Sequence, residues 1–270
     1  RLWRSDDRGD SWTPVSPDLT RQIDRNKLKV AGRVWGVDTN AKNASTSWYG
    51  NIVSLSESPK LEGLLYVGTD DGLVQVSEDG GKTWRKQDTF PGVPHMSYVS
   101  EVMASQHDAN VVYAAFENHK EGDFTPYVMR SADRGRTWTM LTHGLPERGS
   151  VYCLAEDHVD AKLLFCGTEF GCYTSVTGGA KWFPLKGGLP TIQVRDMVVQ
   201  TRENALVLGT FGRGVYVLDD YTPLRRLSSA TLEKPVTTSP AKTALMYVPW
   251  SPIGGRGKGS QGDELFVAPN

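Results

Sequence analysis

Short apolar segments alternate with turns rich in glycine and aspartate along most of the chain. Residues 64–76, 163–173 and 206–218 each read as two short strands joined by a tight turn. Such runs are typical of β-hairpins, and no segment shows sustained helical periodicity. A further apolar strand precedes each hairpin unit, at residues 52–55, 99–104, 151–155 and 194–199. The pattern therefore predicts units of four short strands.

The turn between the third and fourth strands carries a repeated motif, Ser-x-Asp-x-Gly-x-Ser/Thr-Trp, with a degenerate fourth copy at residues 175–182. We interpret the motif as a hairpin clamp. Its Asp accepts hydrogen bonds from turn amides, its Gly supplies a positive φ, and its Trp covers the gap beneath the turn. The residues assigned this structural role are Ser5, Asp7, Gly9, Trp12, Ser77, Asp79, Gly81, Trp84, Ser131, Asp133, Gly135, Trp138, Gly179 and Trp182.

The spacing of these motifs decides the fold class. Successive motif tryptophans lie 72, 54 and 44 residues apart, and a propeller blade spans about 40–50 residues. An insertion at residues 16–46 accounts for the longest spacing, and a long loop between the second and third strands, at residues 117–126, lengthens the third unit. Repeated four-stranded units with turn signals between them predict an all-β fold, a β-propeller with four-stranded blades.

The repeat also sets the expected domain boundaries. The propeller covers residues 1–225, with blades at about 1–20, 47–90, 96–145, 150–190 and 192–220. The first blade has only its outer half and the last lacks a fourth strand. We therefore expect the C-terminal portion of a larger propeller of seven or more blades, with the missing blades supplied by the same or a partner chain. Residues 226–262, rich in Pro, Gly and Ser, read as a linker, and residues 263–270 as the start of a following β domain.

Composition excludes several classes of function. The 270 residues carry 30 basic and 31 acidic side chains, a net charge of −1 that argues against nucleic acid as a partner. No run approaches the length of a membrane span, so no membrane insertion is expected. The five histidines show no metal-ligand spacing, no phosphate loop or nucleophile elbow occurs, and no cofactor or metal is expected. Cys153, Cys166 and Cys172 fall on neighbouring strands, where buried thiols are favoured over a disulfide.

The eight-residue motif resembles the Asp-box, or BNR, repeat of sialidases, sortilin-type receptors and two-propeller xyloglucanases. Residues 12–20, 49–52, 68–72, 209–214 and 218–220 extend the resemblance to large bacterial exported proteins known as sortilin-like or BNR-repeat glycosyl hydrolases. The resemblance covers residues 1–225 and, less closely, the tail at residues 262–270. It implies an extracellular, periplasmic or cell-surface location.

The resemblance assigns no active site. Sialidases need an arginine cluster, a Tyr–Glu pair and an acid Asp, and the N-terminal motif that anchors this set is not in this sequence. The catalytic Asp pair of xyloglucanases is not assigned to any position either. The repeats that carry the resemblance build blades, so they do not by themselves imply an enzyme.

Blade geometry narrows the search for a site. The motif turns lie on one face of a propeller, whereas the turns between second and third strands and the connections between blades lie on the other, where we expect the ligand. Asp70, Asp71, Glu117 and Glu169 are the candidate catalytic carboxylates, although Asp70 and Asp71 also suit an ordinary hairpin turn. The candidate ligand-binding residues are Trp48, Tyr49, Asp70, Arg195, Phe211 and Arg213.

Three functions fit these residues. The favoured hypothesis is a non-catalytic ligand-binding or scaffold module of an exported multidomain protein, with a carbohydrate or a protein as its ligand. A glycoside hydrolase is the alternative, and it requires two carboxylates about 5–10 Å apart and one carboxyl group with a raised pKa. A sortilin-like peptide receptor, which adds a peptide strand to an exposed blade edge, is the third.

Overall fold

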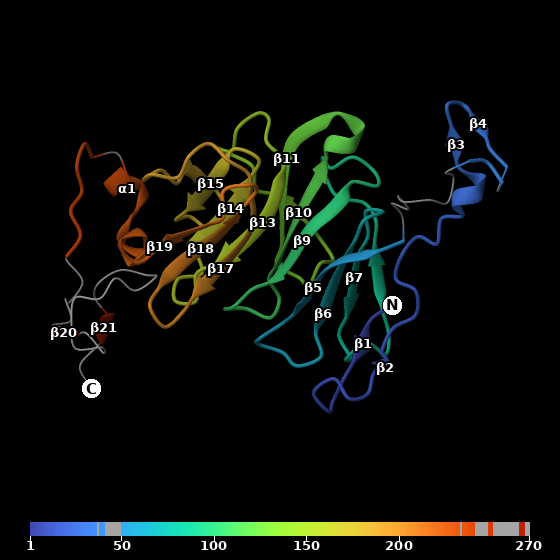
Figure 1. The fold of residues 1–270 in the computed structure, drawn as a ribbon, viewed down its shortest axis with the longest axis horizontal. Helices are drawn as coiled ribbons and strands as arrows, with labels where there is room; N and C mark the ends of the chain where they lie inside the picture. The colour runs from blue at the N-terminus through green and yellow to red at the C-terminus, as the bar shows by residue number, and fades with distance from the viewer. Residues whose placement is uncertain (37, 41–49, 233, 241–247, 251–264, 268–270) are drawn as a thin grey trace. The chain divides into compact units, whose positions relative to one another are not determined.

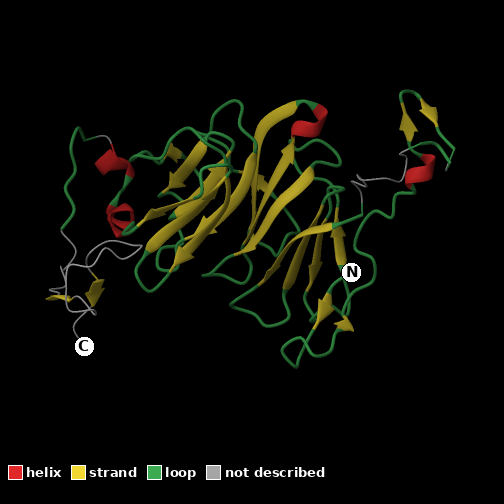
Figure 2. Cartoon of the chain, in the orientation of Figure 1, coloured by secondary structure: helices red, strands yellow, loops and turns green. Residues whose placement is uncertain are grey.

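The structure is a computed structural model that describes residues 1–36, 38–40, 50–232, 234–240, 248–250 and 265–267. The chain divides into two compact units, Arg1–Leu232 and Glu233–Asn270. The first unit is almost entirely β-structure (Figures 1 and 2). Within the part of the chain that the structure describes, no helix is long and apolar enough to cross a membrane.

The first unit contains three complete blades, each an antiparallel meander of four strands in chain order. We number the blades 2, 3 and 4 and letter their strands A to D. The four-stranded blades and the turn positions of the motif are as predicted, so the all-β propeller class is confirmed. The strands are β5 (Ile52–Glu57), β6 (Leu65–Thr69), β7 (Val74–Ser77) and β8 (Arg85–Gln87); β9 (Tyr98–Ala104), β10 (Val112–Asn118), β11 (Asp123–Ser131) and β12 (Thr139–Met140); β13 (Val151–Glu156), β14 (Leu164–Thr168), β15 (Gly171–Ser175) and β16 (Phe183–Pro184).

Incomplete sheets flank these blades in the chain. Blade 1 has the two strands β1 (Trp3–Arg4) and β2 (Thr13–Pro14), and blade 5 has the three strands β17 (Val194–Gln200), β18 (Ala205–Thr210) and β19 (Val215–Leu218). Trp12 is 59% exposed, contrary to its predicted packing role, because a two-stranded sheet offers it no second layer. The smaller elements are η1 (Arg25–Lys27), β3 (Lys29–Val30), β4 (Arg33–Val34), η2 (His119–Glu121), η3 (Thr222–Arg226) and α1 (Ser229–Leu232).

Two expectations about loops need correction. Residues 117–126 were expected to form a long loop, but β10 and β11 continue into it and only η2 and Gly122 separate them. The extra residues therefore lengthen a hairpin. In the second unit, β20 (Val248–Trp250) lies inside the range interpreted as linker and pairs antiparallel with β21 (Leu265–Val267).

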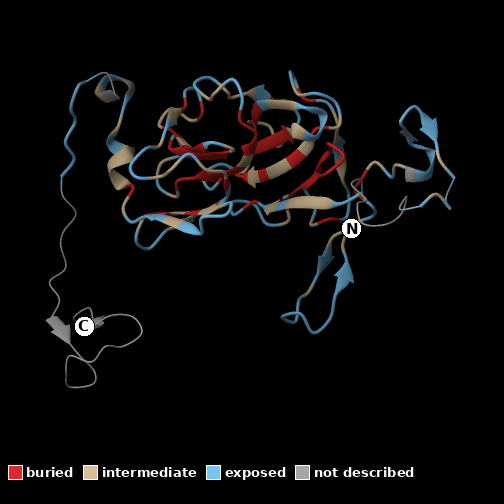
Figure 3. Ribbon diagram, turned by 45° about the horizontal axis from the view of Figure 1, so that its top comes forward, coloured by how far each residue is buried: buried red, intermediate tan, exposed pale blue. Residues whose placement is uncertain are grey.

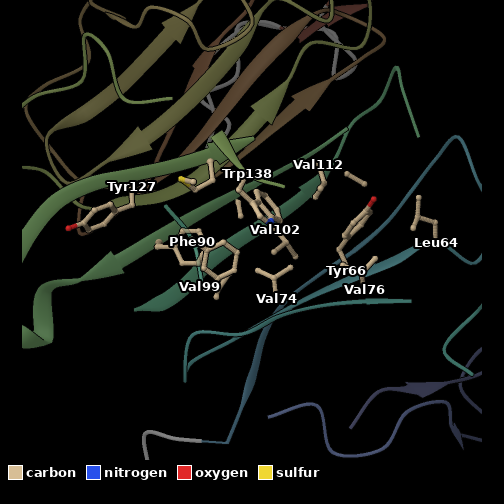
Figure 4. Packing of buried hydrophobic residues seen from close by; sticks show 14 residues of the cluster. Leu64, Tyr66, Val74, Val76, Phe90, Val99, Val102, Val112, Tyr127 and Trp138 are labelled. Atoms are coloured by element: carbon tan, nitrogen blue, oxygen red, sulfur yellow. The ribbon is translucent and has the colours of Figure 1, made fainter. Parts of the chain in front are cut away.

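The apolar core lies between blades. One cluster joins blades 2 and 3, a second joins blades 3 and 4, and a third joins blades 4 and 5. The cluster between blades 2 and 3 includes Tyr66, Phe90 and the motif tryptophan Trp138, whose rings are seen at close range in Figure 4. Phe90 packs 5.6 Å from Trp138 between ring centroids in an edge-on arrangement. Buried residues accordingly concentrate where the sheets of unit 1 face one another (Figure 3).

Inner strands of neighbouring blades also contact each other directly. The unpaired edge of β9 donates backbone hydrogen bonds from Val102 and Ala104 to Ser54 Oγ (2.9 Å) and Ser56 Oγ (3.0 Å) of β5. In the next step around the arc, the Leu154 amide of β13 donates to the Glu101 carboxylate of β9. Side chains of one blade thus satisfy the backbone edge of the next.

In blades 2 and 4, a glycine near the end of the B strand permits this close approach. A Cβ on Gly68 would lie 2.6 Å from Val99 Cγ1, and one on Gly167 would lie 2.3 Å from Cys153 Sγ and 2.9 Å from the Val194 carbonyl oxygen. The glycines of the Gly-Thr pairs therefore place no side chain where the inner strand of the next blade approaches the B strand. Gly209 holds the same position in blade 5, where the nearest atoms to an added Cβ lie 3.6 Å away.

This difference between the two glycines gives the first prediction. Gly167→Ala will lower the free energy of unfolding by about 1–3 kcal/mol, because its methyl group overpacks the junction between blades. Gly209→Ala is the matched control, since it meets only ordinary van der Waals contacts. Urea unfolding of both variants measures the effect, and equal stabilities would contradict this account of the Gly-Thr pairs.

Candidate functional site

The Asp-box turns form a dense network of hydrogen bonds. In the second motif, Asp79 accepts hydrogen bonds from the Thr83 amide (2.8 Å) and hydroxyl (2.6 Å), and also from the hydroxyl of Ser77 (2.8 Å). These bonds, with those from Thr83 the strongest cause, lower the pKa of Asp79 to about 2. Asp7 and Asp133 make the same bonds in their own turns. The motif carboxylates therefore have a structural role, since each stabilises its own turn through these hydrogen bonds.

The turns between A and B strands lie on the same face as the Asp-box turns. The Gly80 amide donates to the Gly63 carbonyl (2.9 Å), and the Gly178 amide donates to the Lys162 carbonyl (2.8 Å). We call this side the box face and the opposite side, which holds the turns between B and C strands, the B–C face. The predicted ligand residues of the B–C turns thus gather on the side away from the motifs.

A shallow hollow of about 50 Å³ lies on the B–C face between blades 2 and 3. Asp70 and Tyr98 form one side, and the hairpin tip of blade 3 forms the other. Glu117 is buried there, and its Oε2 lies 3.2 Å from Nδ1 of His119. The lining residues are Asp70, Met96, Tyr98, Glu117, Asn118, His119, Lys120 and Glu121.

Two partly buried tyrosines extend this hollow toward blade 5. The guanidinium of Arg195 lies 4.1 Å from the ring centroid of Tyr152, and the ammonium of Lys120 lies 5.3 Å from that of Tyr98. Burial, and next the negative charge of Glu117, raise the pKa of both Tyr98 and Tyr152. Glu117 therefore lies within electrostatic range of both phenols. We call Tyr98, Glu117, Tyr152 and Arg195 the tyrosine strip.

The two aspartates of the blade 2 turn are engaged by backbone groups. Asp70 accepts hydrogen bonds from the Gly50 and Asn51 amides (both 3.0 Å) and from Asn51 Nδ2 (2.8 Å). Asp71 is fully buried and accepts from the Arg21 amide (2.7 Å), so it anchors the segment before blade 2. Asp71 is better described as a structural residue, whereas Asp70 lines the hollow at its edge.

The remaining predicted residues lie around the tyrosine strip or beyond it. Glu169 is partly buried, and its charge contributes to the raised pKa of Tyr152, which places it near that ring. Phe211 is 70% exposed, and its amide donates to the Gln193 carbonyl (3.0 Å), next to the start of β17. Arg213 is exposed in the same turn. Trp48 and Tyr49 lie outside the described residues.

Sequence reasoning missed two carboxyl groups with raised pKa values. Burial between inner strands raises the pKa of Glu101 to about 8, even though Glu101 accepts the Leu154 amide hydrogen bond. Burial also raises the pKa of Glu156, which Ser105 and the Gln106 amide contact on the box face. The alternating pattern of β9 and β13 places both residues on strands, but it does not reveal which neighbouring blade covers them.

A third carboxylate, Asp157, holds the η3 segment near the C-terminal end of the first unit. It is fully buried and accepts two hydrogen bonds from the Arg225 guanidinium (2.8 and 2.7 Å) and one from the Tyr221 hydroxyl (2.6 Å). Although burial opposes ionisation, these partners lower its pKa to about 2. η3 is thereby fixed to the turn between β13 and β14.

The cysteines and potential metal ligands offer no alternative site. Cys153, Cys166 and Cys172 are free and buried, which agrees with the thiol interpretation. Burial raises the pKa of each thiol, so none is poised as a nucleophile. Among the described residues, no group of three His, Cys, Asp or Glu side chains could hold a metal ion.

Comparison with known proteins agrees with the geometry of the turns and blades. A family model described as BNR-Asp box repeat matches residues 2–15, and one described as BNR/Asp-box repeat matches residues 75–86. The GH74 enzyme of Niastella koreensis has a similar fold, with a TM-score of 0.55 at 14% sequence identity over 80% of this chain. The chain is a BNR-repeat β-propeller.

A second similar structure is the GH74 xyloglucanase of Xanthomonas campestris, with a TM-score of 0.50 at 14% identity over 63% of this chain. The BNR-repeat propeller described here spans less than a third of either structure, 32% of the Niastella chain and 29% of the Xanthomonas chain. At this identity the similarity concerns the fold alone. No sequence among curated proteins matches it significantly.

The raised pKa of Glu101 gives the second prediction. Its carboxyl group stays protonated up to about pH 8 in the folded propeller but only to its usual value of 4.5 when unfolded. The folded state therefore binds more protons in this interval, and stability falls as the pH rises from about 4.5 through 8. Glu101→Gln keeps an acceptor for the Leu154 amide without the charge. It will be more stable than wild type at pH 8.5, by about 1 kcal/mol or more.

Thermal unfolding at pH 5 and pH 8.5 measures this difference, which will shrink at pH 5. Glu62→Gln, at an exposed turn, is the control and will show no such pH-dependent gain. A difference between Glu101→Gln and wild type that is the same at both pH values would contradict the assignment.

Proposed function

We propose that this propeller is a non-catalytic binding module of an exported protein and that its B–C face binds a carbohydrate. The tyrosine strip is the observation that carries the proposal. It combines two aromatic rings with a carboxylate and a guanidinium on one face, and the adjoining hollow adds His119 and Asn118. Sugars are recognised by aromatic surfaces together with groups that hydrogen-bond hydroxyls.

The carboxylates of this face favour binding over hydrolysis. Glycoside hydrolysis requires two carboxyl groups, one to donate a proton and one to act as base or nucleophile. Asp70 is held by three donors, Asp71 is buried, and Glu117 is buried with its Oε2 3.2 Å from Nδ1 of His119. Of the four predicted candidates, Glu169 alone has no hydrogen bond or ion pair from its carboxylate in the described structure. A single carboxylate does not make an acid–base pair.

A glycoside hydrolase is the second candidate function, because two similar structures are GH74 enzymes. On that alternative, Glu169 would act with a carboxylate from outside the described residues. That activity belongs to those proteins, and the low identity transfers only their fold. Release of sugar from a polysaccharide therefore separates the two functions.

The third prediction tests the binding site. On a glycan array, the full chain will retain at least one class of oligosaccharide, and Arg195→Ala will weaken binding of that oligosaccharide about tenfold, a loss of about 1.4 kcal/mol. Arg195 is exposed, and its side chain contacts only the partly buried ring of Tyr152 among the interactions given above, so the variant will fold. Arg202→Ala removes an exposed arginine from the turn between β17 and β18 and is the matched control.

Three results would overturn the proposal. Failure to bind any oligosaccharide would remove the carbohydrate ligand. Release of reducing ends that Glu169→Gln abolishes would make the protein a hydrolase. Equal losses in Arg195→Ala and Arg202→Ala would place the site away from the tyrosine strip.

A further inference from the structure

The junction between blades 2 and 3 is filled with charged side chains on the box face. Glu78 of the second motif pairs with Arg134 (2.8 Å) and Arg136 (2.7 Å) of the third. Arg85, which follows the tryptophan of the second motif, donates to the backbone carbonyls of Arg134 and Gly135. Four long side chains thus bridge this junction.

The next junction carries small residues at the same four positions. Ala132 corresponds to Glu78, and Thr139 corresponds to Arg85. In the degenerate fourth motif, Gly178 and Ala180 correspond to Arg134 and Arg136. No side chain of comparable length is available to bridge blades 3 and 4 at these positions.

An open cleft of about 430 Å³ occupies this second junction. Its volume lies in the range of small-molecule sites and far exceeds the 50 Å³ of the hollow on the B–C face. Val111 and Leu141 supply apolar wall, and Gly178 and Ala180 of the degenerate motif border it. The degenerate motif therefore coincides with a cleft between blades.

Three polar side chains of the cleft already have hydrogen-bond partners within the protein. Glu156 is buried and accepts hydrogen bonds from the Ser105 hydroxyl (3.0 and 2.9 Å) and the Gln106 amide. His107 Nε2 lies 2.7 Å from the Asp157 carbonyl, to which it must donate. Asp108, the other acid, accepts bonds from the amide and side chain of Asn110. These groups are engaged within the protein.

Arg130 and Lys162 are the two cations of the cleft, and Arg130 makes a side-chain hydrogen bond with the Tyr113 hydroxyl. Arg130 is partly buried next to the Tyr113 hydroxyl, and Lys162 is exposed at the turn between β13 and β14. In the described parts of the chain, no carboxylate lies within 4.0 Å of either charged group. Two cations that have no carboxylate partner among the described residues, beside an apolar wall, favour an organic anion.

We propose that this cleft is a second binding site, which takes a small organic acid with its carboxylate at Arg130 and Lys162. The non-ionic part of the ligand packs against Val111 and Leu141. The guanidinium of Arg130 offers paired donors that match a carboxylate. This site lies on the box face and is independent of the tyrosine strip.

Trp182 provides a reporter for occupancy. Its side chain is buried, and its indole N–H donates to the Leu141 carbonyl (2.8 Å). Leu141 lines the cleft, so a ligand that contacts it changes the surroundings of the indole.

The fourth prediction uses two carboxylates that represent different sources. Glucuronate stands for an acidic sugar and glutarate for an acidic side chain, and neutral glucose is the ligand control. Titration calorimetry and tryptophan fluorescence of the full chain will show saturable binding of at least one carboxylate and none of glucose. Arg130→Gln will weaken that binding at least tenfold, whereas Arg136→Gln, which removes an arginine from the filled junction, will leave it unchanged.

A closing variant tests the origin of the cleft. Ala132→Glu, Gly178→Arg and Ala180→Arg together rebuild the charged bridge of the preceding junction. Arg134 has a φ of 57° and Gly178 a φ of 68°, and no atom lies within 4 Å of a Cβ added to Gly178, so arginine fits there. The variant will fold, because Arg134 adopts the same positive φ at the matching position of blade 3, and it will lose carboxylate binding.

Absence of binding by both carboxylates at millimolar concentration would overturn the proposal. Binding that survives both Arg130→Gln and the closing variant would also overturn it, because the anion would then lie elsewhere. Binding of glucuronate alone would assign an acidic sugar, and binding of glutarate alone would assign an acidic side chain.

Discussion

The unpaired edge of each inner strand is the constraint on which the rest of the propeller depends. An A strand pairs within its own sheet on one side only, so the amides on its other side need acceptors. Ser54, Ser56 and Glu101 supply such acceptors to the next blade. Gly68 and Gly167 remove the side chains that would hold the blades apart. Each junction between blades therefore provides hydrogen-bond acceptors for the backbone amides and also lets the blades pack closely. The apolar clusters between blades depend on this close packing.

This junction also determines where functional groups collect. Because blades repeat around an arc with the same strand order, turns of the same kind from successive blades lie on the same face. Tyr98 and Tyr152 start the A strands of blades 3 and 4, and Arg195 starts that of blade 5. Residues about 40–55 positions apart thereby form one strip with Glu117. The proposed binding surface is thus a product of the repeat, to which blades 3, 4 and 5 each contribute one or two side chains.

Sequence variation between the repeats makes the junctions differ in how completely side chains fill them. The Asp-box turn keeps its own hydrogen bonds through Ser, Asp and Thr, which leaves the residues between them free to vary. At one junction those positions carry Glu78, Arg134 and Arg136 and close the gap with ion pairs. At the next they carry alanine and glycine, and a cleft lies above Glu156 and Arg130. Short side chains at these variable positions thus leave open space between the blades, while the strands below keep their pairing.

The amino-acid sequence by itself determined the local architecture. The Ser-Asp-Gly-Trp pattern fixed the hairpin clamps, because their hydrogen bonds join residues two to four positions apart. Spacing and strand pattern likewise predicted four-stranded blades and the face on which B–C turns gather. Contacts about 40–55 residues apart were decided only by the tertiary structure. Examples are the burial of Glu101 and Glu156, the burial of Asp71 against Arg21, and the cleft between blades 3 and 4. Local hydrogen bonds can be read from a short motif, whereas desolvation and free space depend on which side chain a neighbouring blade places opposite.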